Sequence, residues 1–200
     1  MRKSDQRVAE VVASWRDAEL AVVSANMQPQ PSGPILICVC KNEGWRLPCL
    51  LEHYRALGVE HFVFVDNGST DDTRTLLAGQ PGVDTYLCRA PFSTYAQRGW
   101  LHQVIARYGF GKWYLCVDAD EFVVYSGMDS HTLGDLAGLA EREGADRIRG
   151  IFVDMYGPGP LREYEHIETC PDVMAYCRYF DSAGYTAKVA STRVEVQGGP

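Results

Sequence analysis

Apolar runs alternate along the chain with segments whose apolar residues recur at helical spacing. The runs predict strands at residues 34–40, 62–66, 83–88, 112–118 and 149–155. The helical spacing predicts helices at about 47–57, 94–108 and 133–143, and a short helix that ends at about residue 78. Strands and helices alternating at these lengths predict an α/β fold, with a mostly parallel central sheet and helices on both faces.

The N-terminal part of the chain has a different pattern. A helix is predicted within residues 1–27 from apolar residues at helical spacing, namely Val8, Val11, Val12, Trp15, Ala18 and Val22. It is expected to dock on the domain, and a membrane-surface or partner helix is the alternative. Residues 28–34 contain three prolines and a glycine, which predicts a linker. Residues 35–200 suit one domain, which we expect to be incomplete because the chain ends just after the apparent start of a further strand.

Three carboxylates follow directly on the apolar run at 112–117. They are Asp118, Asp120 and Glu121. Alternate side chains of a strand share a face, so the two aspartates could point the same way. At the carboxyl end of a parallel strand such a pair could hold a divalent cation. An isolated D-x-D can also be a solvated turn, and that alternative stays open.

A second predicted strand also ends in a carboxylate, Asp66. Asn67 and Gly68 follow it and favour a turn with positive φ. Ser69 and Asp72 have the spacing of a capping box that would begin the next helix. Asp66 could accept hydrogen bonds from a nucleobase or a ribose hydroxyl, or it could only cap the turn.

Composition narrows the function classes. The formal net charge is −7, and no Lys/Arg-rich stretch is present, which argues against a nucleic-acid partner. The seven cysteines include no C-x-x-C pair, and three of them, Cys38, Cys40 and Cys116, fall in predicted core strands. We therefore expect free thiols and a cytoplasmic protein, with peripheral membrane association through the N-terminal helix as an option.

Several motifs together carry a resemblance to a known family. They are V-C-K-N-E at 39–43, L-L-E-H-Y-R-A-L-G-V at 50–59, V-D-N-G-S-T-D-D-T at 65–73 and W-Y-L-C-V-D-A-D-E-F at 113–122, with looser matches at 153–156 and 179–185. In this order they resemble a glycosyltransferase family 2-like domain over roughly residues 35–200. The resemblance implies a GT-A-type nucleotide-diphospho-sugar transferase fold and a divalent cation, Mn²⁺ or Mg²⁺. It also implies a glycosyltransferase that moves a sugar, with inversion, from a nucleoside-diphosphate sugar to a saccharide, lipid or other acceptor.

Site roles follow from this resemblance. Asp120 is expected to contact the metal, and Asp118 the metal or the donor ribose. Asp66 is expected to bind the base or ribose. Further candidates are expected in the crevice at the carboxyl ends of these strands or within reach of it, namely Lys41, Asn42, Glu43, Gln97, Arg98 and Glu121.

The sequence says less about the residues that would act on the acceptor. Asp154, which precedes a Gly/Pro-rich loop, is a candidate catalytic base, and Asp181 is the alternative. The five histidines show no ligand spacing and are interpreted as surface or structural residues. Two other interpretations stay open. One is a catalytically silent nucleotide-binding domain, and the other is a nucleotidyltransferase, disfavoured because no glycine-rich basic loop follows the first strand.

Overall fold

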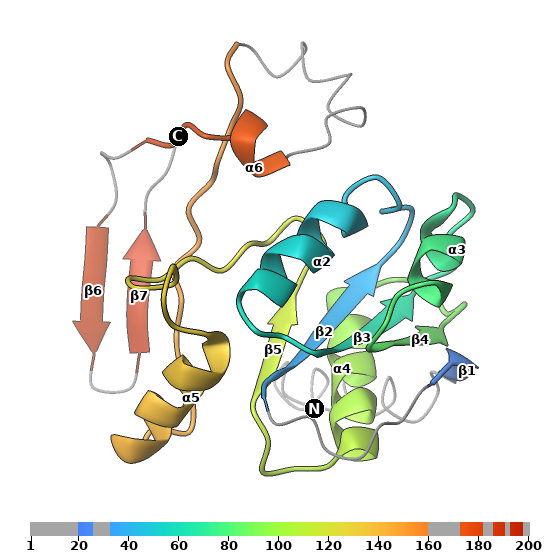
Figure 1. Cartoon of the computed structure of the whole chain (residues 1–200), viewed down its shortest axis with the longest axis horizontal. Coiled ribbons are helices and arrows are strands. Elements are labelled where there is room, and N and C mark those ends of the chain that lie inside the picture. Colours follow the sequence, from blue (N-terminus) through green and yellow to red (C-terminus); the bar gives the residue numbers. More distant parts are fainter. Residues whose placement is uncertain (1–19, 26–32, 160–172, 182–185, 191–192, 198–200) are drawn as a thin grey trace, which may run out of the picture. The chain divides into compact units, whose positions relative to one another are not determined.

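The chain forms two compact units, Met1–Asp146 and Arg147–Pro200, in a computed structural model. The structure describes residues 20–25, 33–159, 173–181, 186–190 and 193–197 (Figure 1).

A five-stranded sheet with four helices makes up the described part of the first unit. The strands are β1 (Ala21–Ser24), β2 (Ile35–Cys40), β3 (His61–Asp66), β4 (Val83–Leu87) and β5 (Tyr114–Val117). The helices are α2 (Leu47–Ala56), α3 (Thr73–Ala78), α4 (Thr94–Tyr108) and α5 (Leu133–Arg142). From β2 to α5, these elements match the predicted ones to within a few residues at each end.

The sheet is mostly parallel, as predicted. Its order is β1-β4-β3-β2-β5, and only β1, which pairs with β4, runs antiparallel. After β2 the chain builds β3 and β4 on one side and then returns to place β5 on the other side. Ligands of open α/β sheets bind at such a reversal, outside the carboxyl ends of the strands. Those ends are level, because Cys40 pairs with Asp66 and Asp66 with Leu87.

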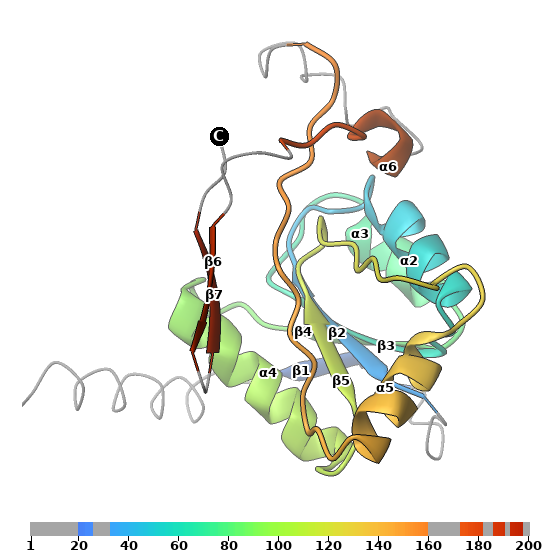
Figure 2. The same cartoon turned by 90° about the vertical axis from the view of Figure 1, so that its left-hand side faces the viewer.

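Helices cover both faces of the sheet, which confirms the second part of the prediction (Figure 2). Leu36 and Cys38 of β2 pack in the cluster that includes α2, whereas Ile35 and Ile37 pack in the cluster that includes Trp100 of α4. Successive side chains of a strand point to opposite faces, so a strand with both faces covered needs an unbroken apolar run. The sequence of β2, I-L-I-C-V-C, supplies one.

Two glycines fit positions where the backbone has positive φ. Gly58 follows α2 with φ of 82°, and Gly68 lies in the turn after β3 with φ of 76°. Both positions were predicted from the sequence, because only glycine adopts this conformation without steric cost.

One prediction near these elements is wrong, and a second is wrong where the structure describes it. Ser69 does not cap the next helix, because α3 begins at Thr73 and the Ser69 hydroxyl instead accepts a hydrogen bond from the Asn42 amide, 2.8 Å away. The helix predicted within residues 1–27 is replaced, where the structure describes it, by strand β1 at Ala21–Ser24. Antiparallel pairing with β4 overrides the helical spacing there, and residues 1–19 and the predicted linker up to residue 32 lie outside the described residues.

The described part of the second unit contains helix α6 (Val173–Tyr176) and an antiparallel hairpin of β6 (Thr186–Ala190) and β7 (Arg193–Gln197). The strand predicted at 149–155 is absent. Within the described residues that segment has no strand partner, and only the next residue, Tyr156, forms an isolated bridge, to Tyr179. An apolar run forms a strand only if another strand lies beside it and pairs with it.

Cys38, Cys40, Cys49, Cys88 and Cys116 are free thiols, but Cys116 is exposed rather than in the core, since β5 is an edge strand. Among the described helices, none has the length and apolar character needed to cross a membrane.

Candidate functional site

A cavity of about 710 Å³ opens at the carboxyl ends of the parallel strands. The segments after β2, β3, β4 and β5 all contribute to its walls, as does the start of α4. Its charged lining residues are Lys41, Glu43, Arg89, Asp118 and Asp120. The cavity therefore lies at the reversal of strand order and brings three carboxylates and two cations together.

Hydrogen bonds tie the loop after β2 to the loop after β3. The amides of Asn42, Glu43 and Gly44 donate to the side chains of Ser69, Thr73 and Asp71, at 2.8, 2.9 and 3.1 Å. In return, the Asn42 carboxamide oxygen accepts from the Thr70 amide at 2.7 Å. The polar residues of the 65–73 motif thus hold the two loops together, and Lys41 and Glu43 project from a fixed backbone.

The buried side chain of Asn67 joins the β3 loop to the β4 loop. Its amide nitrogen donates to the carbonyls of Cys88 and Ala90, at 3.0 and 2.9 Å. These two contacts fix the segment that follows β4, including Arg89 on the cavity wall.

Asp118 and Asp120 lie in a turn rather than on a strand. β5 ends at Val117, and the Glu121 amide donates to the Asp118 carbonyl at 3.1 Å. Ala119 between the aspartates is buried in the core cluster on the α2 side, which leaves both exposed carboxylates on the cavity wall. Glu121 reaches back, and its Oε2 accepts from the Asp118 amide at 2.9 Å. Glu121 therefore closes the turn and helps to orient Asp118.

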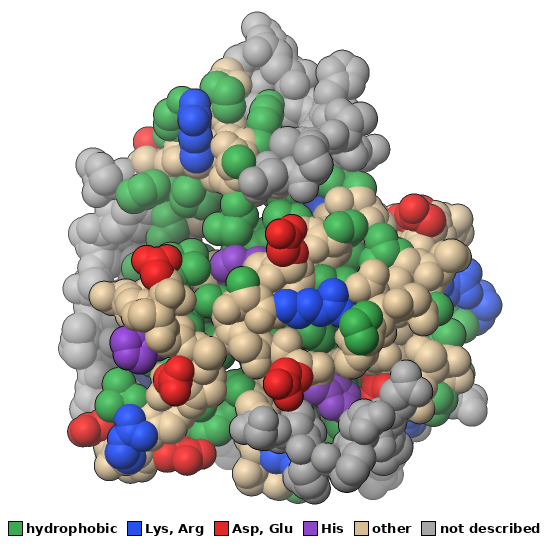
Figure 3. Space-filling model, viewed as in Figure 1, with side chains coloured by type: hydrophobic (Ala, Val, Ile, Leu, Met, Phe, Trp, Pro, Cys, Tyr) green, Lys and Arg blue, Asp and Glu red, His purple; other side chains and the backbone are tan. Residues whose placement is uncertain are grey.

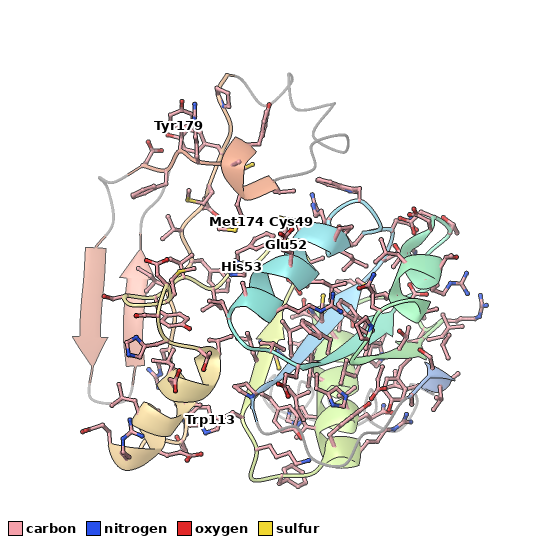
Figure 4. All side chains as sticks on the ribbon, in the orientation of Figure 1. Cys49, Glu52, His53, Trp113, Met174 and Tyr179 are labelled. Atoms are coloured by element: carbon pink, nitrogen blue, oxygen red, sulfur yellow. The ribbon has the colours of Figure 1, made fainter. Side chains whose placement is uncertain are left out.

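Helix α2 anchors the segment that follows these aspartates. The buried Tyr54 hydroxyl donates to the Glu121 carbonyl at 2.8 Å and accepts from the Val123 amide at 3.1 Å. His53, labelled on α2 in Figure 4, donates from Nε2 to the Val123 carbonyl at 3.0 Å, and its ring meets Phe122 edge-on. Burial lowers the pKa of His53, and the Val123 contact partly offsets that. The carboxylate turn thus rests on a helix of the core.

Replacing Tyr54 with phenylalanine is expected to destabilise the first unit. It removes both hydrogen bonds and leaves the Val123 amide without its acceptor, which costs about 1–3 kcal/mol. At about 2–4 °C per kcal/mol for a protein of this size, the thermal midpoint should fall by several degrees. Calorimetry measures the midpoint, and hydrogen exchange at 118–123 should be faster. The control is Tyr125→Phe, which loses one exposed hydroxyl bond, to the His131 carbonyl. Equal small shifts for the two variants would contradict the anchoring role.

Glu43 links the carboxylates to a cation at the start of α2. Its Oε2 forms an ion pair with Arg46 at 2.9 Å. Burial raises the pKa of Glu43, Arg46 opposes the rise, and the nearby Asp120 and Asp71 carboxylates add to it. Burial also raises the pKa of Glu121. Its bond to the Asp118 amide opposes the rise, and the Asp118 and Asp120 carboxylates add to it. The site therefore holds more negative charge than its cations balance.

The raised pKa of Glu43 predicts a pH-dependent stability. The folded protein binds this proton more tightly than the unfolded chain, so the group stabilises the fold below its unfolded pKa. That contribution is lost as pH rises through the folded pKa. The thermal midpoint of Glu43→Gln should therefore rise relative to wild type between about pH 4 and pH 7. A difference that is constant with pH, or that falls, would contradict the direction of the shift.

The structure brings some of the sequence-predicted residues together and not others. Lys41, Glu43, Gln97, Asp118 and Asp120 line the cavity. Four other candidates from the first unit are not among its lining residues, namely Asn42, Asp66, Arg98 and Glu121.

Asp66 serves the loop more than the cavity. It is fully buried, its Oδ1 accepts from the Ser69 amide at 2.8 Å, and Oδ2 lies 3.4 Å from Nε of Arg74. Within the described part of the chain Oδ2 has no hydrogen-bond partner. Because Asp66 is fully buried, a nucleotide could contact its carboxylate only if the groups around it moved.

The candidate bases belong to the second unit. Asp154 is exposed, and Asp181 accepts a hydrogen bond from the Tyr156 hydroxyl at 3.0 Å. Their role as bases stays a prediction.

The four consecutive lining residues at 89–92 were not assigned a role from the sequence. Arg89, Pro91 and Phe92 follow β4, and Phe92 is 60% exposed on the cavity wall. The rule that singled out Asp66 and Asp118 applies equally here, because β4 was predicted as a third strand of the same sheet. Residues just beyond its carboxyl end could have been included on that ground.

The described residues contain no group of three or more His, Cys, Asp or Glu side chains placed to hold a metal ion by themselves. The sequence matches none of the protein-family models and none of the curated proteins with which it was compared.

Proposed function

We propose that the cavity binds a nucleoside-diphosphate sugar together with a divalent cation, and that the protein transfers the sugar to an acceptor. The observation that carries this proposal is the position of the cavity, at the reversal of strand order, with the D-x-D carboxylates on one wall. The resemblance to glycosyltransferase family 2-like domains supports the same function. A GT-A-type fold is part of the proposal.

The charges of the lining suit a diphosphate and a cation better than either alone. Lys41 and Arg89 can pair with phosphate oxygens, whereas Asp118 and Asp120 would repel them. A divalent ion between the carboxylates and the diphosphate would reverse that repulsion. Elsewhere on the described face of the first unit that carries α2, acidic and basic side chains are scattered rather than gathered by sign (Figure 3).

The residues present fit a cation whose remaining ligands come from the substrate. Mg²⁺ is commonly held by one or two carboxylates plus phosphates and water, so two aspartates are enough. Asp120 would hold the ion with Asp118, and Glu43 adds negative charge near Asp120. When bound, the ion supplies charge neutralisation on the departing diphosphate.

The chain's own side chains bind and orient the donor. Lys41 and Arg89 hold the phosphates, and the backbone at Asn67 and Gly68 lies where the nucleoside can approach. Phe92 offers an exposed aromatic face to a planar or apolar group. Asp66 supports the loop that carries Gly68.

Calorimetric titration of the wild-type chain with UDP, GDP and ADP, each with and without Mn²⁺, tests the proposal. Binding of one nucleoside diphosphate that requires Mn²⁺ is the expected result, and it identifies the base. If none of them binds at any metal concentration, the proposed donor site is wrong.

A further inference from the structure

Gln97 contacts one of the two aspartates directly. Its side-chain Nε2 donates to Oδ1 of Asp118 at 2.9 Å, and Gln97 itself lines the cavity. It projects from the start of α4, whose first turn is fixed by Ser93. The Ser93 hydroxyl accepts from the Ala96 amide at 3.1 Å, and its carbonyl accepts from the Gln97 amide at 2.9 Å. The contact therefore joins a capped helix to the turn after β5.

Asp118 is consequently held at two points. Glu121 bonds its backbone amide and Gln97 bonds one carboxylate oxygen, at the same 2.9 Å distance. An exposed aspartate side chain otherwise rotates among several staggered conformers. The contact between Gln97 and Oδ1 limits this rotation, so the carboxylate has a defined orientation toward a ligand in the cavity.

The chemistry of the donor also matters. An amide donates a hydrogen bond without bringing charge, whereas a lysine or arginine at this position would form an ion pair with Asp118. An ion pair would offset the negative charge that attracts a cation. Carboxylates that ligate metals are commonly held by such neutral partners, and removing one typically costs about 10–100-fold in metal affinity or activity.

We propose that Gln97 is a positioning residue of the cation site and acts by orienting the Asp118 carboxylate. This inference rests on the proposed function, because it concerns the ion that would accompany the nucleotide. It assigns to α4 a role in the site that the D-x-D motif alone does not contain.

The test is a titration with Mn²⁺ in the presence of UDP, GDP or ADP, whichever binds the wild-type chain, at saturating concentration. Free Mn²⁺ is measured by its paramagnetic resonance signal. Gln97→Met, which keeps the length of the side chain and removes the donor, is expected to weaken Mn²⁺ binding about 10–100-fold. The same exchange in an Asp118→Asn background should cost nothing further, because the residue acts through Asp118. Gln103→Met makes the identical substitution elsewhere on α4, outside the cavity lining, and is expected to bind Mn²⁺ as wild type does.

The outcomes separate the two proposals. Wild-type affinity in Gln97→Met, or an equal loss with and without the Asp118 carboxylate, overturns the role of Gln97 and leaves the proposed function standing. Absence of Mn²⁺ binding by the wild-type chain with UDP, GDP and ADP alike overturns the proposed function, and this inference with it.

Discussion

Replacing Asp120 with alanine is expected to abolish Mn²⁺-dependent nucleotide binding and to lower sugar transfer by a factor on the order of 1000. Asp120 is exposed on the cavity wall, whereas the Asp118 carboxylate is already bonded to Gln97. A divalent ion stabilises a departing diphosphate by several kcal/mol, and about 1.4 kcal/mol corresponds to tenfold in rate. Loss of the ion therefore accounts for a factor of this size.

The stability of the variant should change little, because Asp120 is exposed. Asp129→Ala, which removes another exposed carboxylate outside the cavity, is the matched control and should bind and transfer normally. Calorimetry with the nucleoside diphosphate and a coupled assay for its release measure the two effects. Metal-dependent binding that survives in Asp120→Ala would contradict the assignment of this residue.

Replacing Asp84 with alanine is expected to destabilise the first unit by about 3–5 kcal/mol. Asp84 lies in β4 and is almost fully buried, as is His61. His61 Nε2 donates to Asp84 Oδ2 at 2.9 Å, and the Tyr108 hydroxyl donates to the same oxygen. The Tyr108 and Tyr86 hydroxyls are 3.1 Å apart. The substitution removes the acceptor that His61 and Tyr108 share. A buried donor that loses its acceptor costs free energy, because it has also given up its hydrogen bond to water.

Thermal and urea unfolding measure this loss. At about 2–4 °C per kcal/mol, the thermal midpoint should fall by roughly 6–20 °C. Asp84→Asn keeps an acceptor oxygen and should lose clearly less. A change below about 1 kcal/mol in Asp84→Ala would mean that the network contributes little to the fold.

Much of the fold could be predicted because its pattern is local. The apolar runs of β2 and β3 are buried on both faces, and Gly58 marks the end of α2. The carboxyl ends of parallel strands meet at one edge, so the sequence alone indicates that Asp118 and Lys41 lie close together.

The remaining features depend on partners distant in the sequence. Ser69 has the spacing of a helix cap, yet its hydroxyl serves the loop after β2. His61 was expected only to be a surface or structural residue, and its buried partner Asp84 could not be identified from spacing. The sequence of the short edge strand β1 does not predict a strand, and the strand is defined by its pairing with β4.

The site shows the same division. The D-x-D motif identified two lining carboxylates, but the burial of Asp66 and the contact between Gln97 and Asp118 arise only when loops and α4 come together. The apolar segment at 149–155 predicted a strand, and only the structure shows that it pairs with none of the described strands.

Anomalous diffraction from crystals of the chain grown with Mn²⁺ and the nucleoside diphosphate that binds most tightly tests the central claim most directly. The proposed site requires an anomalous manganese peak within about 2.0–2.6 Å of a carboxylate oxygen of Asp118 or Asp120, with diphosphate oxygens completing the ligands. A nucleotide bound elsewhere on the molecule, or bound in the cavity with no manganese at these aspartates, would contradict it.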